Sequence, residues 1–173
     1  MRGLLVGRFQ PFHLGHLAVV RHILHARPTE PLVLGIGSAE DAYTPDNPFT
    51  ASERFEMITR ALAAEKITGW LAVPIPDIHR HSLWVAHVEE LVPEFSRVYT
   101  NNPLTRTLFE KADYAVEGTP LFERERNEGA AIRRLLREDS PGWRERVPPS
   151  VVAYLDELRA TERLRSFGSP SAG

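Results

Sequence analysis

The sequence predicts an α/β protein with a doubly wound parallel sheet of about five strands, followed by C-terminal helices. Short apolar runs alternate with segments of helical periodicity, and the connections between them are short. Strands joined in this way pair in parallel through right-handed crossovers, so helices cover both faces of the sheet. Such a Rossmann-like sheet binds its ligands at the carboxyl ends of its strands.

Each element has its own sequence pattern. The apolar run 3–6, ended by a glycine, is typical of a strand buried on both faces. Helical spacing of apolar residues then begins at Leu14 and is ended by Pro28. Thr50 and Glu53 form a predicted capping box at the start of a helix that runs through Leu62. Further strands are expected at 32–36, 70–75, 98–99 and 114–116, and further helices at 83–91, 104–110, 128–137 and 150–164.

Length and composition narrow the class of protein. A chain of 173 residues predicts one domain over 1–165, and the polar segment 166–173 is expected to be a flexible tail. The absence of cysteine excludes disulfides, thiolate zinc sites and cysteine nucleophiles. A net charge of −2 argues against nucleic acid as a partner. The apolar run near the N-terminus is too short to cross a membrane, so a cytoplasmic protein without a membrane partner is expected.

Four loops follow predicted strands and are therefore expected to converge on one cleft. They are the segments 7–16, 35–42, 74–82 and 100–103.

The first of these loops has the residue types of a phosphate-binding turn. Gly7 and Gly15 allow close backbone approach, and Arg8 carries a guanidinium that matches phosphate oxygens. His13 and His16 lie three residues apart at a helix start, where free N–H groups and the helix dipole favour anions. The histidines alone are also compatible with helix capping, with core positions or with a shared metal ion, although no third ligand lies nearby in the sequence. Their context favours a polyphosphate.

The motif at 13–16, His-Leu-Gly-His, resembles the H-x-G-H motif of the nucleotidylyltransferase superfamily. The longer string G-R-F-Q-P-F-H-L-G-H over 7–16 is similar to that of archaeal-type nicotinamide-nucleotide adenylyltransferases. Further segments resemble this family in the same order, so the resemblance reaches about residue 165. They are 35–39, 47–54, 83–87, 98–103, 120–122 and 132–134.

The resemblance implies transfer of an adenylyl group from ATP to nicotinamide mononucleotide (NMN), giving NAD and pyrophosphate. It implies that Arg8, His13, His16 and Arg133 hold the ATP phosphates and are catalytic. It also implies Mg²⁺ bound mainly through those phosphates, with no metal ligand from the protein. The implied substrate-binding residues are Gly7, Phe9, Gln10, Ser38, Arg54, His81, Trp84 and Asn102.

Several of these residues also have a purely structural interpretation. Trp84 is expected to stack on the nicotinamide ring, but a lone tryptophan on an apolar helix is equally a core residue. Asn102 precedes a proline and is equally a turn former. Arg54 could form only a surface pair with its neighbour Glu53, and Arg133 could be one more solvated charge.

Three departures from the family pattern keep other functions open. His81 stands where the family commonly has asparagine, Asp46 stands where a basic residue is frequent, and 128–130 replaces a Ser-Gly-Thr segment. The alternatives are the same chemistry on flavin mononucleotide or pantetheine phosphate, and a nucleotide sensor without turnover. The family resemblance also makes a homo-oligomer an option, with an exposed Trp143 as one place for a subunit contact.

Overall fold

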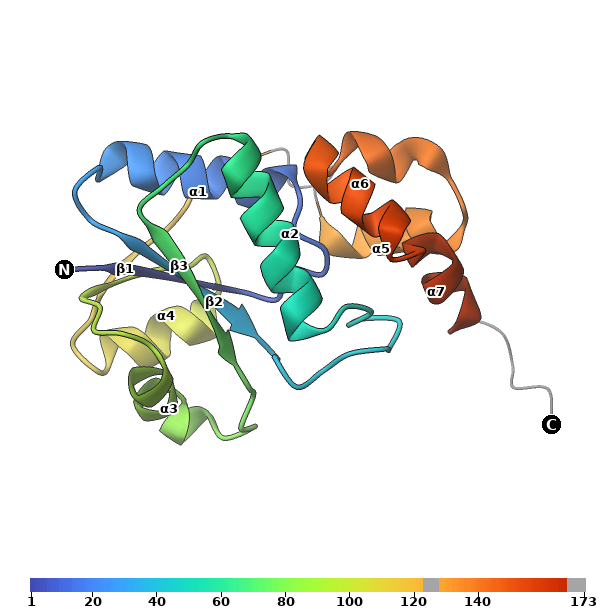
Figure 1. Cartoon of the computed structure of the whole chain (residues 1–173). Helices are drawn as coiled ribbons and strands as arrows, with labels where there is room; N and C mark the ends of the chain where they lie inside the picture. Colours follow the sequence, from blue (N-terminus) through green and yellow to red (C-terminus); the bar gives the residue numbers. More distant parts are fainter. Residues whose placement is uncertain (123–127, 168–173) are drawn as a thin grey trace. The chain divides into compact units, whose positions relative to one another are not determined.

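A computed structural model of the chain describes residues 1–122 and 128–167. It contains a sheet in the order β3-β2-β1-β4-β5 with every neighbouring pair parallel, which confirms the predicted fold class (Figure 1). A central first strand with crossovers to both sides is the doubly wound arrangement. The strands are β1 (Gly3–Gly7), β2 (Leu32–Gly37), β3 (Trp70–Ile75), β4 (Arg97–Tyr99) and β5 (Ala115–Glu117).

Except in the last predicted helix, over 150–164, the helices of the described residues lie close to the predicted segments. The last predicted strand is displaced by one residue, since β5 starts at Ala115 rather than Tyr114. The helices are α1 (Leu14–Ala26), α2 (Ala51–Ala64), α3 (Trp84–Leu91), α4 (Pro103–Glu110), α5 (Gly129–Arg137), α6 (Pro149–Glu157) and α7 (Ala160–Ser166), with short 3₁₀ helices η1 (His81–Leu83) and η2 (Pro141–Glu145). None of them has the length and apolar character needed to cross a membrane.

The chain divides into two compact units. The sheet unit consists of residues 1–8, 19–40 and 67–120 and contains all five strands. The helical unit consists of 9–18, 41–66 and the described part of 121–173. The single domain over 1–165 stays a prediction. Of the predicted tail, Ser166 ends α7, and residues 168–173 lie outside the described residues.

The core of the sheet unit forms where α3 and α4 cover one face of the sheet. Val88 of α3 and Phe109 of α4 pack with strand residues such as Leu4, Val33 and Val98, and all five are fully buried. Such burial of apolar side chains is the main stabilising contribution to a core of this kind. It fixes the strands whose carboxyl ends carry the four loops that are expected to converge.

The capping box of α2 is confirmed. Thr50 Oγ1 accepts the backbone N–H of Glu53 at 3.1 Å, and the Glu53 carboxylate accepts the backbone N–H of Thr50 at 2.9 Å. The Glu53 carboxylate also accepts hydrogen bonds from Arg163 of α7 at 2.7 and 2.8 Å. The start of α2 is therefore fixed both locally and by the C-terminal helix.

The predicted single helix over 150–164 is wrong, because the structure has α6 and α7 with a break between them. Arg159 has a left-handed backbone (φ 51°) and directly precedes α7. The buried residues Leu155 and Ala160 are five positions apart, so an unbroken helix would place them about 140° apart around its axis. The break lets α6 pack on α2 while α7 packs on α5.

The expectation of an exposed Trp143 is also wrong. Trp143 lies in η2 and is buried, with the guanidinium of Arg144 4.5 Å from its ring centre. Its indole contributes to the core of the helical unit and is not available for a subunit contact.

Candidate active site

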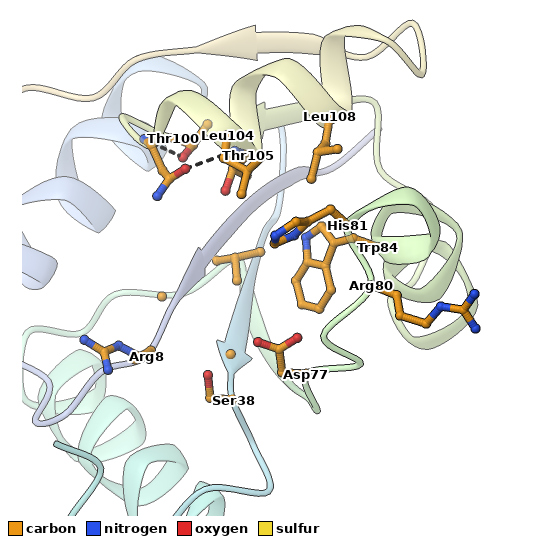
Figure 2. Close-up of a pocket in the computed structure, with 14 residues that line it drawn as sticks. Arg8, Ser38, Asp77, Arg80, His81, Trp84, Thr100, Leu104, Thr105 and Leu108 are labelled. Carbon is orange, nitrogen blue, oxygen red and sulfur yellow. Dashed lines mark hydrogen bonds between the residues drawn. The ribbon is translucent and has the colours of Figure 1, made fainter. Parts of the chain in front are cut away.

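A cavity of about 400 Å³ opens in the sheet unit at the carboxyl ends of the strands (Figure 2). Each of the four loops expected to converge contributes residues to this cavity. The predicted convergence is therefore confirmed for the parts of these loops that belong to the sheet unit. We call this cavity the strand-end pocket. It is lined by Val6, Gly7, Arg8, Gly37, Ser38, Asp77, Arg80, His81, Trp84, Thr100, Asn102, Leu104, Thr105 and Leu108.

One side of the strand-end pocket is aromatic. Trp84 begins α3, packs against the core of the sheet unit and lines the cavity, with His81 of η1 nearby. Figure 2 shows these two side chains on the opposite side of the pocket from Arg8. An indole at a pocket wall offers a flat face to an aromatic or cationic ring. Trp84 is therefore at once a core contact and a pocket residue.

Asn102 lines the pocket and caps a helix, while its predicted role in substrate binding stays a prediction. Its Oδ1 accepts the backbone N–H of Thr105 at 3.0 Å, which caps the N-terminus of α4, and its own N–H donates to Thr100 Oγ1 at 3.0 Å. This pair of bonds fixes the side chain at the pocket wall. Because the cap uses the carbonyl oxygen of the side chain, the amide nitrogen of Asn102 is the atom suited to a ligand.

The loop between β3 and η1 is held at several points. The Glu40 carboxylate accepts the backbone N–H of Asp77 with both oxygens, at 3.1 and 2.9 Å. Asp77 Oδ1 accepts the backbone N–H of His79 at 2.8 Å. The Nε2 of His87 on α3 lies 2.9 Å from the carbonyl oxygen of Pro76. The Asp77 carboxylate is thus carried by an ordered loop into the lining of the pocket.

In the helical unit, the two motif histidines pack against each other. Their rings stack with centroids 3.5 Å apart, and each Nδ1 accepts the backbone N–H of the other residue at 3.3 Å. Burial lowers the pKa of His13 to about 3. Burial and, secondarily, the proximity of His13 hold the pKa of His16 well below its ordinary value. Both imidazoles are therefore neutral, and since each Nδ1 is an acceptor, each carries its proton on Nε2.

Phe9 contributes to the surroundings of this pair. Its backbone is left-handed (φ 52°), its ring is buried, and it contacts the ring of His16 edge-on with centroids 4.8 Å apart. Phe12 lies 5.5 Å from the same imidazole. The sequence-predicted role of Phe9 as a substrate contact stays a prediction, while the structure shows it packed against His16.

Gln10 and Arg133 lie together in the helical unit. Arg133 is 6% exposed, and its Nη1 donates to the backbone carbonyl oxygen of Gln10 at 2.9 Å. The Gln10 side chain donates to the carbonyl oxygen of Phe49 at 2.9 Å and accepts the N–H of Phe49 at 3.0 Å. A side chain on Gly129 would place its Cβ 3.1 Å from Arg133 Nη1. Asp46 lies 3.7 Å from Arg133, so this departure from the family pattern forms an ion pair.

Arg54 is not in a surface pair. Its side chain is fully buried and donates to the backbone carbonyl oxygens of Thr50 at 3.2 Å and Asp41 at 3.4 Å. The loop that precedes α2 is therefore fastened to the helix by a buried guanidinium, an arrangement that favours a role in positioning this loop.

The structure thus distributes the sequence-predicted site residues over two groups. The strand-end pocket brings together Gly7, Arg8, Ser38, His81, Trp84 and Asn102. The helical unit holds Phe9, Gln10, His13, His16, Arg54 and Arg133.

Sequence reasoning did not select two charged residues of the pocket, Asp77 and Arg80. Both follow β3 within the loop that was expected to reach the cleft. A charged residue two positions after a parallel strand was the signal that could have identified Asp77.

Comparisons with known proteins show the family of the chain. Residues 4–148 match the family model described as cytidylyltransferase-like. The chain is 47% identical over 165 residues to a nicotinamide-nucleotide adenylyltransferase of Haloarcula marismortui, covering 95% of this chain and 86% of the relative. It is 44% identical to a protein of the same name from Thermoplasma volcanium, covering 97% and 93%.

Among solved structures, the fold is similar to a bifunctional NMN adenylyltransferase/ADP ribose pyrophosphatase of Francisella tularensis complexed with AMP and a manganese ion. The TM-score is 0.79 at 18% identity, over 95% of this chain and 51% of the other. At this identity the likeness shows the fold alone.

Proposed function

Because this chain belongs to the nicotinamide-nucleotide adenylyltransferases of the cytidylyltransferase-like family, we propose that it joins ATP and NMN to give NAD and pyrophosphate. The observation that carries the proposal from the structure is the stacked pair His13 and His16. Two neutral imidazoles that each present Nε2–H at the start of a helix form an anion site without a net charge of their own.

In the proposed reaction, a phosphate oxygen of NMN attacks the α-phosphorus of ATP. The new P–O bond forms as the bond to the β,γ-pyrophosphate breaks, and no covalent enzyme intermediate is needed. Catalysis of such a transfer consists largely of positioning and of stabilising charge on the phosphate oxygens. We assign this role to the Nε2–H groups of His13 and His16 and to the guanidinium groups of Arg8 and Arg133.

Arg133 is suited to this role because its position is fixed before any ligand binds. Its contact with the Gln10 carbonyl oxygen at 2.9 Å orients the guanidinium, and the missing side chain of Gly129 leaves room for it. A guanidinium remains charged at all physiological pH values and can donate two parallel hydrogen bonds to phosphate oxygens.

We propose Mg²⁺ as the metal ion of the reaction, bound mainly through the ATP phosphates. The donor set fits this arrangement, because residues 1–122 and 128–167 contain no group of three His, Cys, Asp or Glu side chains that could hold an ion. Mg²⁺ keeps several waters and needs few protein ligands. When bound, the ion would neutralise charge on the triphosphate and the departing pyrophosphate.

The strand-end pocket is our candidate for the nicotinamide end of NMN. Its volume of about 400 Å³ is within the range of small-molecule sites. Trp84 offers a stacking surface to the flat pyridinium, and the amide of Asn102 offers a hydrogen-bond donor in the lining of the same pocket. A cytoplasmic location and a homo-oligomeric state remain predictions.

A second candidate is the same transfer to another phosphorylated acceptor, and the observation that favours it is His81. Its imidazole lines the pocket at the position where the family commonly has asparagine, so the donors and acceptors offered to the ring differ. Supplying purified protein with ATP, Mg²⁺ and one acceptor at a time separates the candidates. NMN should give the highest kcat/KM, whereas faster pyrophosphate release with flavin mononucleotide or pantetheine phosphate would overturn the proposal.

A further inference from the structure

The strand-end pocket contains a carboxylate that the proposed reaction does not use. Asp77 lines the cavity with a side chain that is 40% exposed. Figure 2 shows its carboxylate directed toward the side of the pocket where Trp84 lies. An anionic group near an aromatic wall creates a local environment that favours a flat cation.

One contact holds the Asp77 carboxylate itself, and two more hold the backbone that carries it. Glu40, which follows β2, accepts the Asp77 backbone N–H with both carboxylate oxygens. The N–H of His79 holds Asp77 Oδ1 at 2.8 Å, and His87 contacts the carbonyl oxygen of Pro76 at 2.9 Å. A charge that is fixed before the ligand binds discriminates between ligands better than one on a mobile side chain.

We propose that Asp77 makes the strand-end pocket selective for a pyridinium mononucleotide with an uncharged carboxamide, against the acid form with a carboxylate on the ring. The inference rests on the proposed function and adds to it the residue that determines selectivity between NMN and its acid form. Asp77 would act by contacting the ring end of the acceptor, remote from the phosphate that reacts.

The two acceptors differ in charge at the end that faces Asp77. The ring of the amide form carries one positive charge, so the Asp77 carboxylate attracts it. The ring of the acid form carries the same pyridinium charge and also a carboxylate, so the net charge of the ring is zero. The ring carboxylate is repelled by the carboxylate of Asp77. Selectivity of this kind comes as much from repulsion of the wrong ligand as from attraction of the right one.

The cationic residues of the same pocket are placed less favourably for the acid form. Figure 2 shows the Arg80 side chain extending away from Trp84 and Asp77, and Arg8 on the opposite side of the pocket. Arg8, which we assign to the reacting phosphates, therefore lies away from the aromatic wall, and Asp77 is the charged group directed toward that wall.

The test is the ratio of kcat/KM for NMN to kcat/KM for nicotinate mononucleotide, at saturating ATP and Mg²⁺. We expect the unchanged protein to prefer NMN and Asp77→Asn to lower the ratio by about tenfold or more. The change should arise mainly from a higher KM for NMN with kcat nearly unchanged. Asparagine keeps the shape and can still accept the N–H of His79, so the loop should be retained.

Glu90→Gln is the matched control, because it removes the same charge from the exposed face of α3 and should leave the ratio unchanged. An unchanged ratio in Asp77→Asn, or an equal change in Glu90→Gln, overturns the inference. Should Asp77→Asn fail to fold, Asp77→Ser replaces it, because a serine hydroxyl can also accept the N–H of His79. The failure of the unchanged protein to adenylate either acceptor would instead overturn the proposed function.

Discussion

The imidazole rings of His13 and His16 stack face to face, and each Nδ1 accepts the backbone N–H of the other residue. This reciprocal pairing fixes the tautomer of both rings without any third side chain. The pair supplies two oriented Nε2–H donors rather than two cations.

Replacement of either histidine by alanine should lower kcat by about 100-fold to 1000-fold, because each removes one oriented donor to the phosphates in the transition state. The measurement is the initial rate of NAD formation with both substrates saturating. His25→Ala, on the exposed side of the same helix, should have an unchanged rate.

His16→Ala also separates a catalyst from a nucleotide sensor. A sensor would show a changed affinity for ATP and no turnover in either form of the protein. If the unchanged protein turns over substrate and His16→Ala does so at the same rate, the role assigned to the histidine pair is contradicted.

The histidine pair should make the protein less stable in acid. The pKa of His13 is about 3 in the folded chain and 6.5 as its ordinary value, so the unfolded chain binds more protons between these pH values. The free energy of unfolding should therefore fall as the pH is lowered from about 6.5 toward about 3. Urea denaturation at several pH values measures this slope.

Nitrogen NMR of the labelled protein tests the same point directly. The Nδ1 atoms of His13 and His16 should stay unprotonated from pH 8 to pH 5, while a synthetic peptide of residues 9–18 titrates near the ordinary value. Protonation of both rings near pH 6.5 in the folded protein would refute the neutral pair.

Gly129→Ala should separate activity from stability. Its Cβ would lie 3.1 Å from Arg133 Nη1 and 3.4 Å from the carbonyl oxygen of Gln10, so the guanidinium must move by a few tenths of an ångström. We expect kcat/KM for ATP to fall by about tenfold, since positioning of the phosphate contact is lost. Stability should be unchanged or higher by up to about 1 kcal/mol, because alanine favours helices more than glycine.

Gly142→Ala serves as the control for this change, since its nearest contacts are ordinary ones at 3.8 and 3.9 Å. A Gly129→Ala variant with full activity would show that Arg133 does not need its observed position.

Gln10 should matter for stability more than for substrate contact. Gln10→Leu leaves the buried N–H and carbonyl groups of Phe49 without their partners, which costs about 1–3 kcal/mol for each group. Gln10→Glu keeps the acceptor but cannot donate when ionised, so its loss should be intermediate. Urea denaturation midpoints measure both variants, and a loss below about 0.5 kcal/mol in Gln10→Leu would contradict the pairing.

The sheet and most helices could be predicted from the sequence because their apolar residues follow simple periods. The break between α6 and α7 carries neither glycine nor proline, and the spacing of five from Leu155 to Ala160 was the signal that a single helix does not fit. Arg159 has a left-handed backbone because α6 packs on α2 while α7 packs on α5. These are contacts between distant segments, which a local sequence pattern does not predict.

The candidate site was predictable to the level of loops and less so for individual side chains. The place of Trp84 in the pocket was implied by the family resemblance of 83–87, because position alone equally predicts a core residue. The burial of Arg54 did not, because one of its partners is the backbone of Asp41, thirteen residues away in an irregular loop. The neutral state of His13 and His16 depends on burial by Phe9 and on ring stacking, which spacing alone does not show.

The most direct test of the proposed function follows the phosphorus atoms of ATP. Purified protein is incubated with NMN, Mg²⁺ and ATP labelled either at the α-phosphorus or at the γ-phosphorus. Adenylyl transfer predicts that the α label appears in NAD and the γ label in pyrophosphate, in equal amounts. Label from the γ position in the nucleotide product, or release of pyrophosphate without formation of NAD, would contradict it.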